Sequence, residues 1–166
     1  MEEAGKQTGR VAIVIGSRSD MELAERATTV LDGLGIASEV RVISAHRAPR
    51  LLTSYVSAAP AKGVQLFIAI AGLAAHLPGV IAAQTELPVI GVPGGGGSLN
   101  GLDALLSIVQ MPRGIPVATV GIGNAENAAL LAASILALGD TEIRARLSEH
   151  REAQTRAVEE DATNQG

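Results

Sequence analysis

Short apolar runs alternate along this chain with longer segments in which apolar residues recur at helical spacing. The apolar runs predict buried strands at 11–15, 39–43, 64–71, 88–92 and 116–122. Helical spacing, together with capping residues, Pro and Gly at the ends, predicts helices over 23–34, 49–59, 76–84, 102–109, 124–138 and 141–160. Strands that alternate with helices imply an α/β fold, in which helices cover both faces of a parallel sheet.

No linker, repeat or second domain interrupts this alternation, so residues 9–160 are expected to form one α/β domain. Residues 1–8 and 161–166 are expected to be disordered tails. The final helix is highly charged, and His150 on it is expected at the surface or at an interface. A weak apolar stripe on the same helix could pack on the body or on a neighbouring subunit: Ile143, Leu147, Ala157 and Val158.

Composition restricts both the core and the partners. Apolar residues make up 47% of the 166, yet Tyr55 and Phe67 are the only aromatic residues, so the core must be built from Ala, Val, Ile and Leu. The net charge is −4 and no basic run exists, which makes nucleic acid a poor partner. Cysteine is absent, which excludes disulfides, thiolate catalysis and cysteine-ligated metal sites.

The segment 63–85 carries no charged residue, but Gly72, Pro78 and Gly79 interrupt it. Two short buried elements explain this segment better than one membrane-spanning helix. The N-terminus is polar and lacks the apolar region of a secretory signal. We therefore expect a cytoplasmic protein without a membrane partner.

Polar residues follow the first two predicted strands. Gly-Ser-Arg-Ser-Asp at 16–20 precedes a helix, where backbone amides attract an anion, serines add donors and an aspartate can accept from ribose hydroxyls. Helix capping by Ser19 or Asp20 explains the same residue types. Ser-Ala-His-Arg at 44–47 combines an imidazole suited to proton transfer with a guanidinium suited to a phosphate. The alternative interpretation of residues 44–47 is a surface turn with a capping serine.

Two further segments follow predicted strands. Residues 71–79 are mostly small, which lets a ligand approach closely, and they include His76, a candidate ligand-binding or structural histidine. The four glycines at 94–97 form either a lid or a flexible connection. In a parallel sheet the segments at 16–20, 44–47 and 71–79 lie along one carboxyl edge. One crevice there could hold a phosphate, a ribose and a proton-transferring imidazole.

These segments resemble a known family. The motifs are Gly-Ser-x-Ser-Asp at 16–20, Ser-Ala-His-Arg-x-Pro at 44–49, Ala-Ala-His-Leu-Pro-Gly at 74–79, Ser-Ile-Val-Gln-Met-Pro-x-Gly-Ile-Pro at 107–116 and Asn-Ala-Ala-Leu-Leu-Ala-Ala at 127–133. Over about residues 10–155 the chain closely resembles the N5-carboxyaminoimidazole ribonucleotide mutases of purine biosynthesis, the PurE family. The resemblance implies a flavodoxin-like three-layer αβα sandwich with about five parallel strands and a C-terminal helix. It also implies a homo-octamer with active sites at subunit junctions.

The resemblance further implies the reaction and the residues that perform it. The reaction is isomerisation of 5-carboxyamino-1-(5-phospho-D-ribosyl)imidazole to 5-amino-1-(5-phospho-D-ribosyl)imidazole-4-carboxylate, by decarboxylation and recarboxylation, without metal, biotin, ATP or other cofactor. The partners are then this ribonucleotide and carbon dioxide, with His46 as the general acid/base. The residues that would bind the ribose phosphate are Ser17, Ser19, Asp20, Ser44 and Arg47. Those that would close over the carboxylate and carbon dioxide are Gly72, Leu73 and His76.

The chain departs from the bacterial mutases at two positions. They usually read Gly-Ala-Gly-Gly-Ala-Ala-His where residues 70–76 read Ile-Ala-Gly-Leu-Ala-Ala-His, so Ile70 and Leu73 replace glycines. The related carboxylases, which take up free carbon dioxide, read Ile-Ala-Gly-Arg-Ser-Asn there and tend to carry lysine in place of Arg47. An aminoimidazole ribonucleotide carboxylase is therefore the nearest alternative. A flavin- or nucleotide-binding module without catalysis is the alternative from another class.

Overall fold

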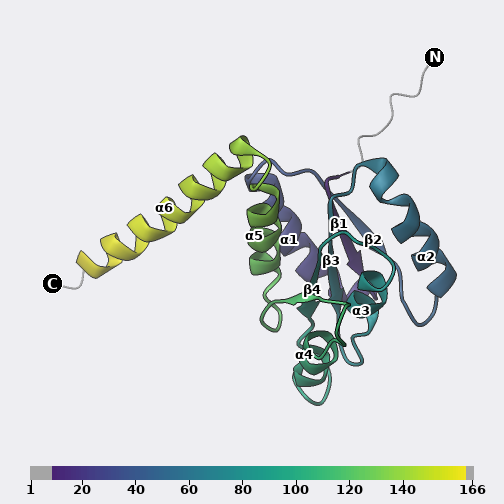
Figure 1. Cartoon of the computed structure of the whole chain (residues 1–166). Coiled ribbons are helices and arrows are strands. Elements are labelled where there is room, and N and C mark those ends of the chain that lie inside the picture. Colours follow the sequence, from purple (N-terminus) through teal and green to yellow (C-terminus); the bar gives the residue numbers. More distant parts are fainter. Residues whose placement is uncertain (1–8, 164–166) are drawn as a thin grey trace.

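The structure, a computed structural model, describes residues 9–163 and consists of a five-stranded parallel sheet between two layers of helices (Figure 1). The spatial order of the strands is β2 (Ser38–Val42), β1 (Val11–Ile15), β3 (Leu66–Ala71), β4 (Val89–Pro93) and β5 (Ala118–Thr119). The predicted flavodoxin-like sandwich is thereby confirmed. The chain reverses its direction across the sheet between β1 and β3, so the carboxyl ends of these strands form the topological switch point where open α/β sheets bind ligands.

The helices divide between the two faces of the sheet. The first layer contains α1 (Met21–Gly33), α5 (Ala125–Leu136) and the start of α6 (Thr141–Thr163). The second layer contains α2 (Pro49–Ala58), α3 (Leu77–Ala82) and α4 (Leu102–Val109). Two 3-10 turns, η1 (Arg18–Asp20) and η2 (Pro60–Lys62), precede α1 and follow α2. Side chains alternate along each strand, so Ile68 of β3 packs in the first layer and Phe67 in the second.

Small residues allow the helices to pack closely on the sheet. A methyl group added at Gly91 of β4 would overlap Cγ2 of Ile108 in α4. The core consists almost entirely of Ala, Val, Ile and Leu, as the composition predicts, and Phe67 is the largest fully buried side chain. Close packing of small aliphatic groups thus fills most of the core, and its one pair of aromatic side chains among the described residues, Tyr55 and Phe67, meets edge to face with ring centroids 6.4 Å apart.

The structure corrects two predicted boundaries. The strand predicted at 116–122 has only two residues, Ala118 and Thr119, which pair with Ile90 and Gly91. It is an edge strand, and Pro116 has no N–H to donate to a ladder. The helix predicted to end at 160 runs to Thr163, so residues 161–163 are helical and not part of a disordered tail. The predictions for residues 1–8 and 164–166 lie outside the described residues.

The terminal helix packs on the body only through its first turns. Ile143 and Leu147 join the first-layer core, whereas Val158 is 69% exposed. Figure 1 shows the second half of α6 projecting away from the sheet. His150 is half-buried, and its Nε2 atom is buried with no hydrogen-bond partner among residues 9–163. Of the helices within residues 9–163, none combines the length and the apolar character needed to cross a membrane.

Candidate functional site

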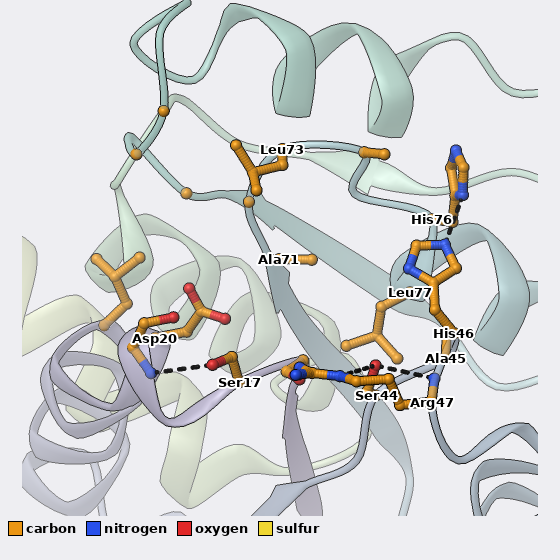
Figure 2. A pocket seen from close by; sticks show the side chains of 18 of the residues that line it. Ser17, Asp20, Ser44, Ala45, His46, Arg47, Ala71, Leu73, His76 and Leu77 are labelled. Carbon is orange, nitrogen blue, oxygen red and sulfur yellow. Dashed lines mark hydrogen bonds between the residues drawn. The ribbon is translucent and has the colours of Figure 1, made fainter.

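A pocket of about 790 Å³ opens at the switch point of the sheet (Figure 2). Its walls come from the ends of four strands, with residues 16–20 after β1, 44–47 after β2, 71–77 after β3 and 94–97 after β4. Parallel strands end at one edge of the sheet, which is why segments far apart in the sequence meet here. The pocket is lined by all nine predicted site residues, namely Ser17, Ser19, Asp20, Ser44, His46, Arg47, Gly72, Leu73 and His76.

The turn after β1 presents hydroxyl groups and one carboxyl group. Ser17 Oγ accepts a 3.4 Å hydrogen bond from the backbone N–H of Ser19 and so caps the short turn η1. Asp20 stands at the N-cap position of α1, but its side chain makes no capping hydrogen bond to that helix. Capping by Asp20 therefore does not explain this residue. Burial raises the pKa of the Asp20 carboxyl, and a backbone hydrogen bond from Ser17 offsets part of the rise.

The turn after β2 holds Arg47 against the first turn. The Arg47 backbone N–H and Nε both donate to Ser44 Oγ, at 3.2 and 3.3 Å, and Nη2 donates to the carbonyl oxygen of Gly16 at 3.2 Å. No ion pair to Arg47 is found within residues 9–163. Its positive charge therefore lies beside the Ser17 turn without a carboxylate to neutralise it, which suits the binding of an anion. We call the polar lining residues of these two turns other than His46 the polar wall: Ser17, Ser19, Asp20, Ser44 and Arg47.

His46 and His76 form a hydrogen-bonded pair. His46 Nε2 lies 2.8 Å from His76 Nδ1, and the two rings are nearly perpendicular, at 83°. One nitrogen must donate and the other accept, so the two rings together carry at most one extra proton while the contact is kept. Both side chains are exposed. His76 is therefore hydrogen-bonded, as the structural alternative expects. Its partner, however, is His46, the predicted acid/base, so His76 also belongs to the site.

The opposite side of the pocket is apolar. Residues 71–74 and the four glycines at 94–97 form it, and we call these two segments the apolar wall. Figure 2 shows Leu73 across the pocket from Ser17 and Ser44. Of the other lining residues, Leu23 is the one that lies outside the segments singled out from the sequence, 16–20, 44–47, 71–79 and 94–97. Its only signal was position, since it lies three residues after Asp20.

Two motifs of the resemblance contribute nothing to this pocket. The segments 107–116 and 127–133 do not line it. Met111 instead lies beside Gly79, with its Sδ atom 3.1 Å from where a Cβ would be. Across residues 9–163, no group of three or more His, Asp or Glu side chains is placed to hold a metal ion.

The fold and the pocket define a class: doubly wound α/β proteins whose switch-point pocket brings hydroxyl, guanidinium and imidazole groups together. Comparison with known proteins specifies the family within that class. A family described as AIR carboxylase matches residues 10–157, so the chain belongs to the AIR carboxylase family.

Relatives and solved structures agree with this assignment. The chain is 53% identical over 157 residues to N5-carboxyaminoimidazole ribonucleotide mutase of Brucella melitensis, a match that covers 93% of the chain and 97% of that relative. It is 48% identical over 148 residues to a chloroplastic phosphoribosylaminoimidazole carboxylase of Vigna aconitifolia, covering 89% of the chain but 27% of the plant protein. The crystal structure of Treponema denticola PurE superposes with a TM-score of 0.87 at 34% identity, covering 93% of the chain and 96% of the PurE chain.

Proposed function

We propose that this chain is an N5-carboxyaminoimidazole ribonucleotide mutase of purine biosynthesis, an isomerase that moves a carboxyl group from a nitrogen to a carbon of one ribonucleotide. The observation that carries the proposal is the meeting of Arg47 and the Ser17 turn with His46 in one pocket. The relatives that match along nearly their whole length favour a mutase over a carboxylase. The Brucella mutase, for example, is matched over 97% of its length.

The polar wall binds the ribose phosphate in this proposal. Arg47 supplies a positive charge, the hydroxyls of Ser17, Ser19 and Ser44 supply donors, and the Asp20 carboxyl accepts from ribose hydroxyls. Because Ser44 Oγ and the Gly16 carbonyl hold the guanidinium, little side-chain entropy is lost when the phosphate binds. The phosphate and ribose thereby fix the position of the imidazole base relative to His46.

His46 transfers the proton twice. Protonated His46 gives its proton to the substrate nitrogen as the N–C bond of the carbamate breaks and carbon dioxide forms. The imidazole C4 then attacks carbon dioxide and forms the new C–C bond, and His46 removes the C4 proton to restore the aromatic ring. The proton donated first is recovered last, so no co-reactant or cofactor is consumed. Holding carbon dioxide beside the attacking carbon makes the second step intramolecular in effect.

His76 belongs to the same proton-transfer unit. Its hydrogen bond to His46 Nε2 fixes the orientation of the His46 ring and restricts which tautomer it adopts. Gly72 and Leu73, in the apolar wall, cover the carboxylate and carbon dioxide.

We further propose that the chain works in the cytoplasm as a homo-octamer with active sites at subunit junctions. An exposed apolar face on α4 supports assembly, because Leu102, Leu106 and Val109 lie on it at 49%, 48% and 49% exposure. The exposure of His46 and His76 in the single chain supports a site completed by a neighbour. The cytoplasm is where an ionised ribonucleotide remains once made, since its phosphate does not cross a bilayer unaided.

An assay with the carbamate substrate, with and without bicarbonate, tests this function. A mutase converts the carbamate to the 4-carboxylate at the same rate in both buffers. A carboxylase produces the 4-carboxylate only from 5-aminoimidazole ribonucleotide and added bicarbonate, and that outcome would replace the proposal by its nearest alternative. Absence of turnover with either substrate, together with a retained flavin or nucleotide, would indicate a binding module.

A further inference from the structure

Asn100 precedes Gly101 in the turn that joins the glycine segment 94–97 to α4. Among residues 9–163 it is the only asparagine followed by glycine, because Asn124 and Asn127 both precede alanine. The pair has the left-handed backbone that this dipeptide favours, with φ of 49° at Asn100 and 85° at Gly101. Asn100 is exposed in the single chain. Because glycine has no side chain, nothing on Gly101 shields its backbone nitrogen from the Asn100 carboxamide.

Neither of these two groups is held by a hydrogen bond. In the described part of the chain, the Gly101 N–H has no acceptor and the Asn100 carboxamide has no partner. The backbone amides on either side of Gly101 do have acceptors. The Asn100 N–H donates to the Gly97 carbonyl at 3.3 Å, and the Leu102 N–H donates to the Leu99 carbonyl at 3.0 Å. The Gly101 nitrogen is therefore available to react with the side chain that precedes it.

The other two asparagines of the described chain are followed by amides that already donate hydrogen bonds. The Ala125 N–H, which follows Asn124, donates to the Gly123 carbonyl at 3.1 Å. The Asn124 side chain is itself engaged, since its Oδ1 atom accepts from the Asn127 N–H at 3.1 Å and caps α5. The Ala128 N–H, which follows Asn127, donates to the Asn124 carbonyl at 3.4 Å. These two residues are internal controls for the chemistry of Asn100.

We propose that Asn100 is a site of spontaneous deamidation, and that the isoaspartate formed there alters the pocket. The Gly101 nitrogen attacks Asn100 Cγ and forms a new N–C bond. The carboxamide C–N bond breaks, and ammonia leaves with the proton of the Gly101 nitrogen. Water then opens the five-membered imide ring. Cleavage at Cγ gives aspartate, whereas cleavage at the main-chain carbonyl carbon gives isoaspartate. Water is the only other reactant.

The change reaches the pocket because Gly101 lies close against the glycine segment. A Cβ on Gly101 would be 2.7 Å from the Gly94 carbonyl oxygen and 3.0 Å from the Gly95 Cα, and both of these glycines line the pocket. Isoaspartate adds one methylene to the main chain directly before Gly101, and this displaces Gly101 relative to Gly94 and Gly95. Aspartate keeps the normal main chain, and its charge near the start of α4 is favourable to that helix.

The test is an ageing experiment on the full chain in mildly alkaline buffer. Peptide mapping by mass spectrometry follows the gain of about 1 Da at each asparagine. We expect Asn100 to lose its amide at least about tenfold faster than Asn124 and Asn127, and to give two product peptides that chromatography separates. Conversion of the carbamate by the same samples should fall in step with the isoaspartate fraction. The activity measurement rests on the proposed mutase function, whereas the mass measurement does not.

Two variants separate the altered main chain from the added charge, and residue 100 does not line the pocket. Asn100→Gly accepts a φ of 49° and has no amide to lose, so it should keep its activity throughout the incubation. Asn100→Asp carries the charge of the product on a normal main chain, and fresh protein should have wild-type activity.

The outcomes address the site, its effect and the proposed function separately. Loss of the amide from Asn100 no faster than from Asn124 would overturn the site. Isoaspartate without loss of activity, or an equal loss in Asn100→Gly, would overturn the effect on the pocket. Failure of the fresh wild-type chain to convert the carbamate would overturn the proposed function, and the peptide masses would still decide whether Asn100 deamidates.

Discussion

The polar and apolar walls of the pocket are built in opposite ways. In the polar wall, hydrogen bonds tie side chains to backbone, as where the Arg47 backbone N–H donates to Ser44 Oγ and Arg47 Nη2 donates to the Gly16 carbonyl. In the apolar wall, two loops touch through glycine backbone and one leucine, and no side-chain hydrogen bond joins them in the described residues. In the proposed function, fixed donors of the polar wall bind the charged phosphate, and the apolar wall covers the neutral carbon dioxide. The histidine pair stands between the two walls.

The largest expected effect is at the histidine pair. His46→Asn removes the group that we propose gives and recovers the proton, so kcat should fall about 100-fold to 10,000-fold. Both walls remain, so substrate should still bind, which calorimetry with the carbamate or the product can measure. Near-normal turnover by a folded His46→Asn protein would remove His46 from the mechanism.

The next effect is in the polar wall. Arg47→Ala removes the charge-assisted contact that we propose Arg47 makes to the phosphate, and KM should rise roughly 10-fold to 100-fold with a smaller change in kcat. Arg47→Lys is the matched variant, since it keeps the charge but loses the planar donors that Ser44 and Gly16 hold. We expect it to lie between the wild-type chain and Arg47→Ala. An unchanged KM in Arg47→Ala would place the phosphate elsewhere.

In the apolar wall, the addition of a single methyl group should lower the stability of the folded chain. Gly97→Ala places alanine at a φ of 84° and puts its Cβ 2.5 Å from Cδ2 at the mobile end of the exposed Leu73, so backbone strain should set most of the loss in the free energy of unfolding, about 1–2 kcal/mol. Denaturant titration measures this loss. In a Leu73→Ala background the overlap disappears, so the same substitution should cost less by at least about 0.5 kcal/mol. Equal costs in both backgrounds would mean that the two residues do not touch.

The smallest effect concerns Asp20 and pH. Burial raises the pKa of this carboxyl in the folded chain, so the folded state binds the proton more tightly than the unfolded chain does. Ionised Asp20 therefore costs stability at pH values above its folded pKa, and the cost vanishes below its unfolded pKa. Asp20→Asn should melt slightly above the wild-type chain at pH 7, and the gain should disappear as the pH falls through the folded pKa. If the gain in melting temperature persisted unchanged at acid pH, it would have a cause other than the ionisation of Asp20.

The sequence predicted the sheet and the pocket because both follow from local patterns. Apolar runs mark the strands, and polar residues at their carboxyl ends converge in any parallel sheet. The Leu73–Gly97 contact was not predictable, because it joins residues of separate loops and places leucine in a conformation that propensity disfavours. The hydrogen bond between His46 and His76 likewise depends on how two loops meet. The sequence did not predict that α6 projects from the body. The weak apolar stripe on this helix is compatible with packing either on the body or on a neighbouring subunit.

The fate of the carboxyl carbon tests the central claim most directly. The carbamate is prepared with 13C in its carboxyl group and converted in unlabelled bicarbonate buffer, and the label is located in the product. A mutase that holds carbon dioxide between its two walls leaves most of the label in the 4-carboxylate of the product. A product without label, formed only at the rate at which free carbon dioxide is supplied, would contradict the claim.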